Sequence, residues 1–211
     1  QVVIEQYKTK NRAMPGFLFI KYCMNICIFS LPRSGTRYIS KLIAMSPIVK
    51  EVIDEPFNVD IGDIANNQYV DLCNNKLSEI VKFDSGLLIK DNLSYFATSL
   101  YENNDQQLLS FIDNYMSHID NHFYKIKLLR SNIFDQALSN CVVQATDIWV
   151  TYHNTPITPC VIDIDQFKAA VEMYYTRHLM LAAIKADHVI NYNDIQDNYD
   201  LDWELLGGNI P

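Results

Sequence analysis

The chain has 211 residues, a net charge of −8, 49% hydrophobic residues and 20% charged residues. This length and composition suit one medium-sized globular domain with a full core. The acidic balance argues against broad nucleic-acid binding, which needs a basic surface. An acidic protein can still bind a small anionic ligand, because a few local basic residues and oriented N–H groups set the electrostatic potential of a pocket.

The apolar stretch at residues 16–29 is interrupted by Lys21 and Asn25 and is too short to span a bilayer. It also leads into a loop and not into a small-residue cleavage site, which argues against a signal peptide. We therefore expect a protein without membrane contact.

Five cysteines are present, with no CxxC pair and no histidine at zinc spacing: Cys23, Cys27, Cys73, Cys141 and Cys160. Their odd number and mostly apolar neighbours indicate reduced, buried thiols. We expect a cytoplasmic location.

Apolar periodicity predicts alternating strands and helices from residue 24 onward. In chain order these are strand 26–29, helix 36–45, helix 69–83, strand 86–90, helix 106–123, strand 125–129, helix 133–145, helix 166–186 and strand 188–192. Asp165 is a candidate N-cap of the long helix. Strands separated by helices favour a three-layer α/β/α fold with a mostly parallel central sheet, in which ligands bind beyond the carboxyl ends of the strands.

Residues 1–23 differ in character from the rest, with a polar start followed by Met14-Pro-Gly. We predict an N-terminal extension over 1–23 and a single α/β domain over 24–211.

The most informative segment is NICIFSLPRSGT at residues 25–36, which predicts a buried strand, a tight turn and the first turn of a helix. Such a turn presents main-chain N–H groups and a helix N-terminus to an anion. It is not the GxxxxGK[ST] loop of kinases, because Phe29 and Ser30 stand at the early positions and Arg33 carries the charge. A phosphate-like ligand is therefore expected to be held differently from ATP.

The pentapeptide PRSGT at residues 32–36 resembles the 5′-phosphosulfate loop of sulfotransferases that use 3′-phosphoadenosine 5′-phosphosulfate (PAPS), a family with a P-loop NTPase-like fold. The resemblance implies that the 5′-phosphate is held by the N–H groups of Ser34, Gly35 and Thr36 and by the Thr36 hydroxyl. It also implies that Arg33 neutralises charge on the bridging oxygen as the bond to sulfur breaks. Arg37 stands where many members have a second Thr or Ser, and it either contacts the phosphates or points outward.

A second motif follows at residues 125–139, where a predicted strand ends in Arg130 and the next helix carries Ser139. It resembles the family's 3′-phosphate motif, in the form seen in bacterial carbohydrate-type members. A guanidinium fork and a hydroxyl bind a phosphate dianion through charge-assisted hydrogen bonds. Ser139 lies nine residues after Arg130, where cytosolic members commonly have eight, and Ser131 is a local substitute.

The acidic turn at residues 54–57 resembles the turn that carries the proposed general base in many bacterial and carbohydrate sulfotransferases, which points to Glu55. Sulfuryl transfer to an alcohol needs a group that accepts the hydroxyl proton. Lys90 ends a strand as a family lysine does, and Asn92 stands where cytosolic members have a catalytic histidine. Asp54 and Asp91 are the next candidates for the base.

The segment from His188 to Ile195 resembles the family's YEDL segment, with Asn193 in place of the Glu, and we interpret it as a marker of the fold. The resemblance as a whole covers residues 24–195. It implies a transferase that moves a sulfuryl group from PAPS to a hydroxyl or amine of a saccharide or small-molecule acceptor, releases 3′,5′-bisphosphoadenosine (PAP) and needs no metal.

Two alternatives remain: a small-molecule or nucleotide kinase of the same broad fold, and a non-catalytic binding protein. Asp163 and Asp165 follow a short apolar run and give a weak version of the magnesium signal of kinases. Two segments, 58–68 and 147–159, are expected to select the acceptor, but they contain no residue pattern that indicates which acceptor it is.

Overall fold

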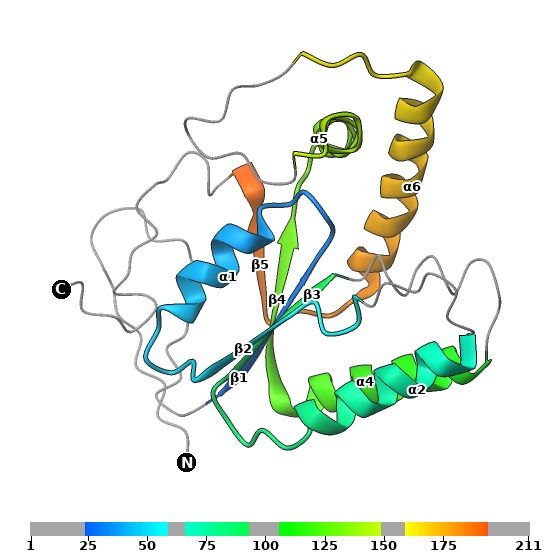
Figure 1. Cartoon of the computed structure of the whole chain (residues 1–211). Helices are drawn as coiled ribbons and strands as arrows, with labels where there is room; N and C mark the ends of the chain where they lie inside the picture. Colours follow the sequence, from blue (N-terminus) through cyan, green and yellow to red (C-terminus); the bar gives the residue numbers. More distant parts are fainter. Residues whose placement is uncertain (1–23, 59–65, 93–105, 149–158, 194–211) are drawn as a thin grey trace, which may run out of the picture.

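The computed structural model describes residues 24–58, 66–92, 106–148 and 159–193 (Figure 1). The predicted extension, 1–23, lies outside these residues, so the division of the chain into an extension and one domain stays a prediction.

Within the described residues, the core of the fold is a five-stranded sheet in which every pair of neighbouring strands is parallel. Its spatial order is β2-β3-β1-β4-β5. The strands are β1 (Asn25–Ser30), β2 (Glu51–Asp54), β3 (Leu87–Asn92), β4 (Phe123–Leu129) and β5 (His188–Asn191). This confirms the predicted α/β fold with a mostly parallel central sheet.

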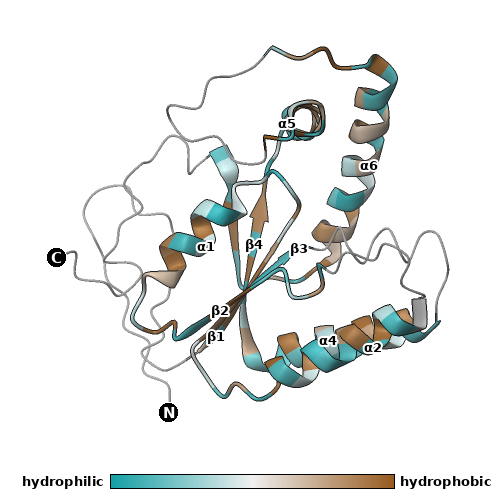
Figure 2. Cartoon of the chain, viewed as in Figure 1, coloured by the Kyte–Doolittle hydropathy of each residue, from teal (hydrophilic) through white to brown (hydrophobic). Residues whose placement is uncertain are grey.

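Helices cover both faces of the sheet, as Figure 1 shows. They are α1 (Thr36–Ala44), α2 (Asn66–Ile80), α4 (Gln106–His122), α5 (Ile133–Thr146) and α6 (Ile164–Ala183). Side chains alternate across β1, as strand geometry requires: Ile26 and Ile28 pack with α1, whereas Cys27 and Phe29 pack with residues of the other helices. In Figure 2 the central strands β1 and β4 are largely hydrophobic, and the helices around them alternate between hydrophobic and hydrophilic residues.

The predicted elements are confirmed with small shifts, and three details differ. Strand β2 was not predicted, because its sequence EVID is short and largely exposed at the edge of the sheet. Strand β3 continues through Asn92 instead of ending at Lys90. Asp163, not Asp165, caps α6: its Oδ1 accepts hydrogen bonds of 2.9 Å from the N–H groups of Asp165 and Gln166.

All five strands point the same way, so their carboxyl ends share one edge of the sheet. The loop after β1, the turn after β2, the end of β3 and the start of the β4–α5 connection therefore lie along that edge. This is where open α/β sheets bind their ligands. Within the described parts of the chain, no helix has both the length and the apolar character needed to cross a membrane.

Candidate anion-binding site

The loop between β1 and α1 has the backbone shape of an anion site. Arg33 and Gly35 both adopt left-handed φ angles, 64° and 78°, and Gly35 is the N-cap residue of α1. Gly35 has no side chain that could cap this helix, and the first turn of the helix contains no acidic residue. Turns of this kind, together with the partial positive charge of a helix N-terminus, attract an anion.

Three buried hydroxyls hold the loop from inside. The Thr36 hydroxyl donates to Ser30 Oγ at 2.7 Å and lies 3.2 Å from Ser34 Oγ, while the Ser34 hydroxyl donates to the carbonyl of Leu31. The Thr36 hydroxyl, predicted to bind phosphate, is therefore engaged with the protein in this structure. The main-chain N–H groups of the loop are accordingly its first candidate donors for an anion.

The two predicted half-sites meet at Arg33. Its side-chain Nε donates to Ser139 Oγ at 2.9 Å, and its carbonyl accepts a hydrogen bond of 2.8 Å from Arg130 Nη1. Ser139 thus reaches the loop despite its nine-residue spacing from Arg130. Ser131, the substitute, is exposed and instead lies 3.5 Å from Asn193 Nδ2.

The guanidinium groups of Arg33 and Arg130 lie close enough to repel each other. Burial lowers the pKa of Arg33, and the charge of Arg130 lowers it further. Among the residues described, no carboxylate pairs with Arg130. Two neighbouring cations that are partly removed from water create a positive potential that a bound anion would neutralise.

Tyr192, which the sequence suggested only as a marker of the fold, forms one wall of this site. The Arg130 guanidinium lies over its ring, 4.8 Å from the centroid, a cation–π arrangement. The ring also lies against the loop, because a Cβ added to Gly35 would lie 2.5 Å from Tyr192 Cε2. Only glycine fits here, since both the close approach and the positive φ exclude a side chain.

A second pair missed by sequence reasoning supports the loop from behind. The Gln136 side chain, fully buried on α5, donates to the carbonyl of Pro32 and lies 2.8 Å from His178 Nε2 on α6. Because Gln136 Oε1 accepts this second bond, His178 carries its proton on Nε2. Gln136 lies within the motif at residues 125–139 but was given no role there, and His178 belongs to no motif of the sequence.

The predicted base, Glu55, lies at the end of β2 and contacts Lys90. The buried Lys90 Nζ is 3.0 Å from Glu55 Oε1 and 2.6 Å from Asp54 Oδ1, and Asn58 Nδ2 donates to Glu55 Oε2 at 3.0 Å. Glu55 has a left-handed φ of 48°, a conformation that costs energy in a non-glycine residue and is often found at functional sites. The structure thus brings together Glu55, Asp54 and Lys90.

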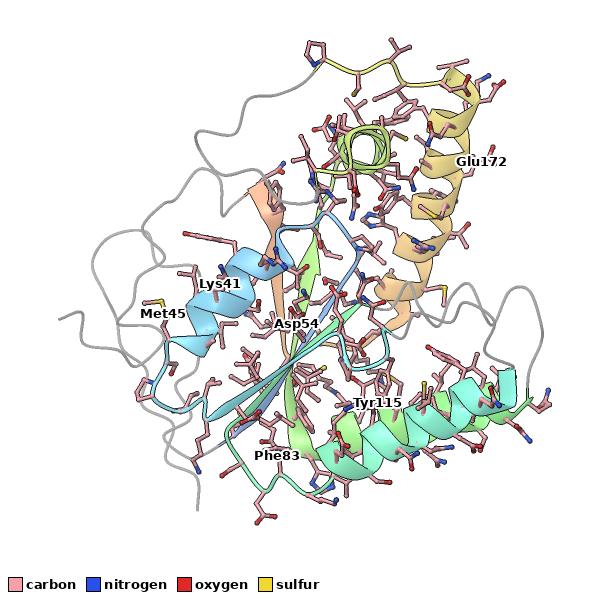
Figure 3. All side chains as sticks on the ribbon, in the orientation of Figure 1. Lys41, Met45, Asp54, Phe83, Tyr115 and Glu172 are labelled. Carbon is pink, nitrogen blue, oxygen red and sulfur yellow. The ribbon has the colours of Figure 1, made fainter. Side chains whose placement is uncertain are left out.

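An open groove of about 850 Å³ runs beside this turn. Its walls come from β2, the turn that follows it, α2 and the chain after α2, and they include Asp54 and Phe83, both labelled in Figure 3. The groove gives the Glu55 carboxylate a neighbouring space for a second substrate.

Asp91 lies behind the Lys90 cluster, at the end of β3. It is completely buried; its Oδ2 accepts a 2.7 Å hydrogen bond from the hydroxyl of Tyr115, the α4 residue labelled in Figure 3, and its Oδ1 has no partner among the described residues. Burial raises the pKa of Asp91 to about 7, and the nearby Glu55 adds to the rise. Near neutral pH, this carboxyl is therefore partly protonated.

Arg37, the remaining predicted ligand of the loop, is exposed on the first turn of α1. Most of the two segments predicted to select the acceptor, 59–65 and 149–158, lies outside the described residues. The part of the chain that is described contains no group of three or more metal-ligating side chains, and its four cysteines are free thiols.

No protein-family model matches the chain, and no curated protein matches it in sequence. Among solved structures, it is similar to a shikimate kinase from Bacteroides thetaiotaomicron, with a TM-score of 0.54 and 13% identity over 88% of this chain and 96% of that one. A mouse sulfotransferase complexed with PAP also aligns, with a TM-score of 0.47 and 16% identity over 89% of this chain and 60% of that one. Deoxyadenosine kinase from M. mycoides with bound dATP gives a TM-score of 0.49 and 15% identity over 88% and 100% of the two chains. At such identities the likeness concerns the fold alone: this chain has a P-loop-like α/β fold.

Proposed function

We propose that the protein is a PAPS-dependent sulfotransferase that moves a sulfuryl group to a hydroxyl or amine of a saccharide or other small-molecule acceptor. One observation carries the proposal: Arg33 contacts Ser139 at 2.9 Å and Arg130 at 2.8 Å. These contacts join the loop to the Arg130–Ser139 motif in one cationic site. A nucleotide with a phosphate on the 3′ oxygen and a phosphosulfate on the 5′ oxygen needs two adjacent anion sites of this kind.

The donor set fits such a nucleotide. The main-chain N–H groups of the loop and the α1 N-terminus suit the 5′-phosphate, and Arg130 with Ser139 suits the 3′-phosphate. PAPS would supply an activated sulfuryl group, whose bond to the bridging oxygen breaks as the acceptor oxygen or nitrogen binds sulfur. Arg33 would stabilise the negative charge that develops on the bridging oxygen.

Glu55 would accept the acceptor's proton as the new bond to sulfur forms. Lys90 would hold the carboxylate through its 3.0 Å contact with Oε1, which leaves Oε2 with Asn58. The groove beside this turn would receive the acceptor.

The first test is metal-independent binding of PAP, measured by calorimetry in the presence of EDTA and compared with binding of ATP and Mg²⁺. We expect PAP to bind in EDTA and ATP to bind weakly with or without Mg²⁺. Tight Mg²⁺-dependent ATP binding would instead support a small-molecule kinase, although the loop lacks the Gly-Lys-Thr of that class.

The second test is transfer of labelled sulfate from PAPS to pooled saccharide and small-molecule acceptors, with the products identified by their mass shift. A labelled product excludes a non-catalytic PAP-binding protein. PAP binding without transfer to any acceptor would favour that alternative.

A further inference from the structure

The hydroxyl of Tyr174, on α6, is a polar group without a partner. Tyr174 is 0% exposed, and its hydroxyl makes no hydrogen bond within the described residues. Burying a hydroxyl in this way costs free energy, and the native structure must have a reason to retain it. A phenylalanine would fill the same space without that cost.

Tyr174 belongs to the buried hydrophobic cluster, and the charges of several arginines reach it there. The charges of Arg177, Arg33 and Arg130 all lie close enough to affect its ionisation. Burial outweighs these charges and raises the pKa of Tyr174 to about 12, so the hydroxyl keeps its proton. It is therefore a hydrogen-bond donor among guanidinium groups, which are also donors and cannot accept its hydrogen bond.

A group of nearby positive charges and a donor without an acceptor both suit one kind of ligand, an anion with several oxygen atoms. The anion site already contains Arg33, Arg130 and Ser139, contributed by the loop, the end of β4 and α5. Tyr174 and Arg177 add a contribution from α6, the helix that packs against α5. The surrounding charges suit a phosphate dianion, which accepts hydrogen bonds on three oxygens.

Building on the proposed function, we infer that Tyr174 is a specificity-determining residue whose hydroxyl donates a hydrogen bond to the 3′-phosphate of the nucleotide. The residue selects nucleotides that carry a 3′-phosphate over those that lack one, because only the 3′-phosphate provides an acceptor beside Arg130 and Ser139. Without the nucleotide, the hydroxyl contributes nothing favourable to the stability of the protein.

The test is the substitution Tyr174→Phe, which removes the hydroxyl and keeps the ring. Calorimetry on the full chain would measure the affinity for PAP, with a 3′-phosphate, and for adenosine 5′-monophosphate, without one. A hydrogen bond to a charged group corresponds to about 10- to 100-fold in affinity. We expect a loss of this size for PAP, unchanged affinity for the monophosphate, and an unchanged or higher melting temperature of the ligand-free protein.

Tyr175→Phe is the matched control, because Tyr175 is the next residue on α6 and is 57% exposed. It is expected to alter neither affinity. Equal PAP affinity in Tyr174→Phe and the unaltered protein would overturn the role of Tyr174 and leave the proposed function standing. A lower melting temperature of Tyr174→Phe would reveal a structural partner of the hydroxyl and also overturn it. Failure of the unaltered protein to bind PAP would overturn both.

Discussion

At the scale of single residues, Arg33 links the phosphate loop to the Arg130–Ser139 motif through both its main chain and its side chain. Its main chain, in a left-handed conformation, turns the carbonyl toward Arg130, while its side chain extends to Ser139. The position of the guanidinium depends on Ser139 and on the repulsion from Arg130. A change at any of these three residues is therefore expected to affect the other two.

Arg130→Ala should weaken PAP binding by about 1.5–3 kcal/mol, the range for a hydrogen bond to a charged group. The substitution removes the guanidinium that pairs with the carbonyl of Arg33 and lies over Tyr192. Calorimetry would measure the change, with adenosine 5′-monophosphate as the comparison ligand. An unchanged PAP affinity would contradict the assignment of Arg130 to the 3′-phosphate.

Gly35→Ala should destabilise the loop by about 1–3 kcal/mol, because alanine is strained at a φ of 78° and its Cβ would lie 2.5 Å from the Tyr192 ring. Tyr192 would have to move from Arg130, so PAP affinity should fall together with the melting temperature. Gly86→Ala is the matched control. Gly86 also has a positive φ, of 83°, but it precedes β3, at the amino ends of the strands and away from the loop. It should lower the melting temperature and leave PAP affinity unchanged, and an equal loss of affinity in both variants would contradict a specific role for Gly35.

Glu55→Gln should leave PAP affinity intact and lower turnover about 10²–10⁴-fold, as expected for loss of a general base. The amide keeps an oxygen for Lys90 but cannot accept the acceptor's proton. Asp54→Asn removes the other carboxylate at Lys90, 57% exposed, and serves as the comparison. Near-normal turnover in Glu55→Gln would assign the base elsewhere, with Asp54 and Asp91 next.

At the scale of elements, the phosphate loop depends on helices that are remote from it in the sequence. Pro32 is held by Gln136 of α5, and Gln136 is in turn held by His178 of α6. Gln136 is fully buried, whereas Pro32 and His178 are partly exposed, so both hydrogen bonds are partly shielded from competition by water. The packing of α5 on α6 therefore fixes the position of a loop that follows β1.

Gln136→Leu should lower the free energy of unfolding by about 1–3 kcal/mol, because it leaves the Pro32 carbonyl and His178 Nε2 without their partner. PAP affinity should fall as well, since the loop loses its support. Urea denaturation and calorimetry would measure the two effects. Gln144→Leu is the control on the same helix: its hydrogen bond to Gln166 is exposed, and the change in stability should stay within about 0.5 kcal/mol. Similar effects of the two substitutions would refute a supporting role for Gln136.

At the scale of the whole molecule, buried titratable groups make stability depend on pH in two opposing ways. Burial lowers the pKa of His118, His178 and His188, so their unfolded forms bind protons more readily and stability falls as pH drops below about 6.5. Asp91 acts in the opposite direction. Its folded pKa, about 7, lies above the unfolded value of 3.8, so its contribution to stability is present at low pH and is lost as pH rises through 7.

Asp91→Asn should therefore be more stable than the unaltered protein at pH 8, by up to about 4 kcal/mol for three pKa units, and the difference should shrink toward pH 4. The asparagine oxygen can still accept the hydrogen bond from Tyr115. Urea denaturation of both proteins at a series of pH values would measure the difference, in which the histidine contributions cancel. Stability curves that run parallel from pH 4 to pH 8 would refute the raised pKa of Asp91.

The order and type of most elements were predictable, because the apolar residues of strands such as 26–29 and helices such as 36–45 follow regular periods. Strand β2 could not be predicted in this way, because an exposed edge strand of four residues shows almost no apolar periodicity. The predicted N-cap of α6 was two residues too late. Asp163 and Asp165 are the same residue type, and only the hydrogen-bond geometry shows that Asp163 is the cap.

The sequence by itself predicted the fold class and the anion loop from local patterns, and its resemblance to a known family supplied the candidates Arg130, Ser139 and Glu55. Only the tertiary structure decided which of these residues meet and what else surrounds them. Ser139 rather than Ser131 reaches Arg33, and Lys90 pairs with Glu55. Gln136 reaches Pro32 across 104 positions of the sequence, and Tyr192 lies under the guanidinium of Arg130, which is carried by another segment. The parallel sheet brings the ends of its strands to one edge, and that arrangement exists only once the whole chain has folded.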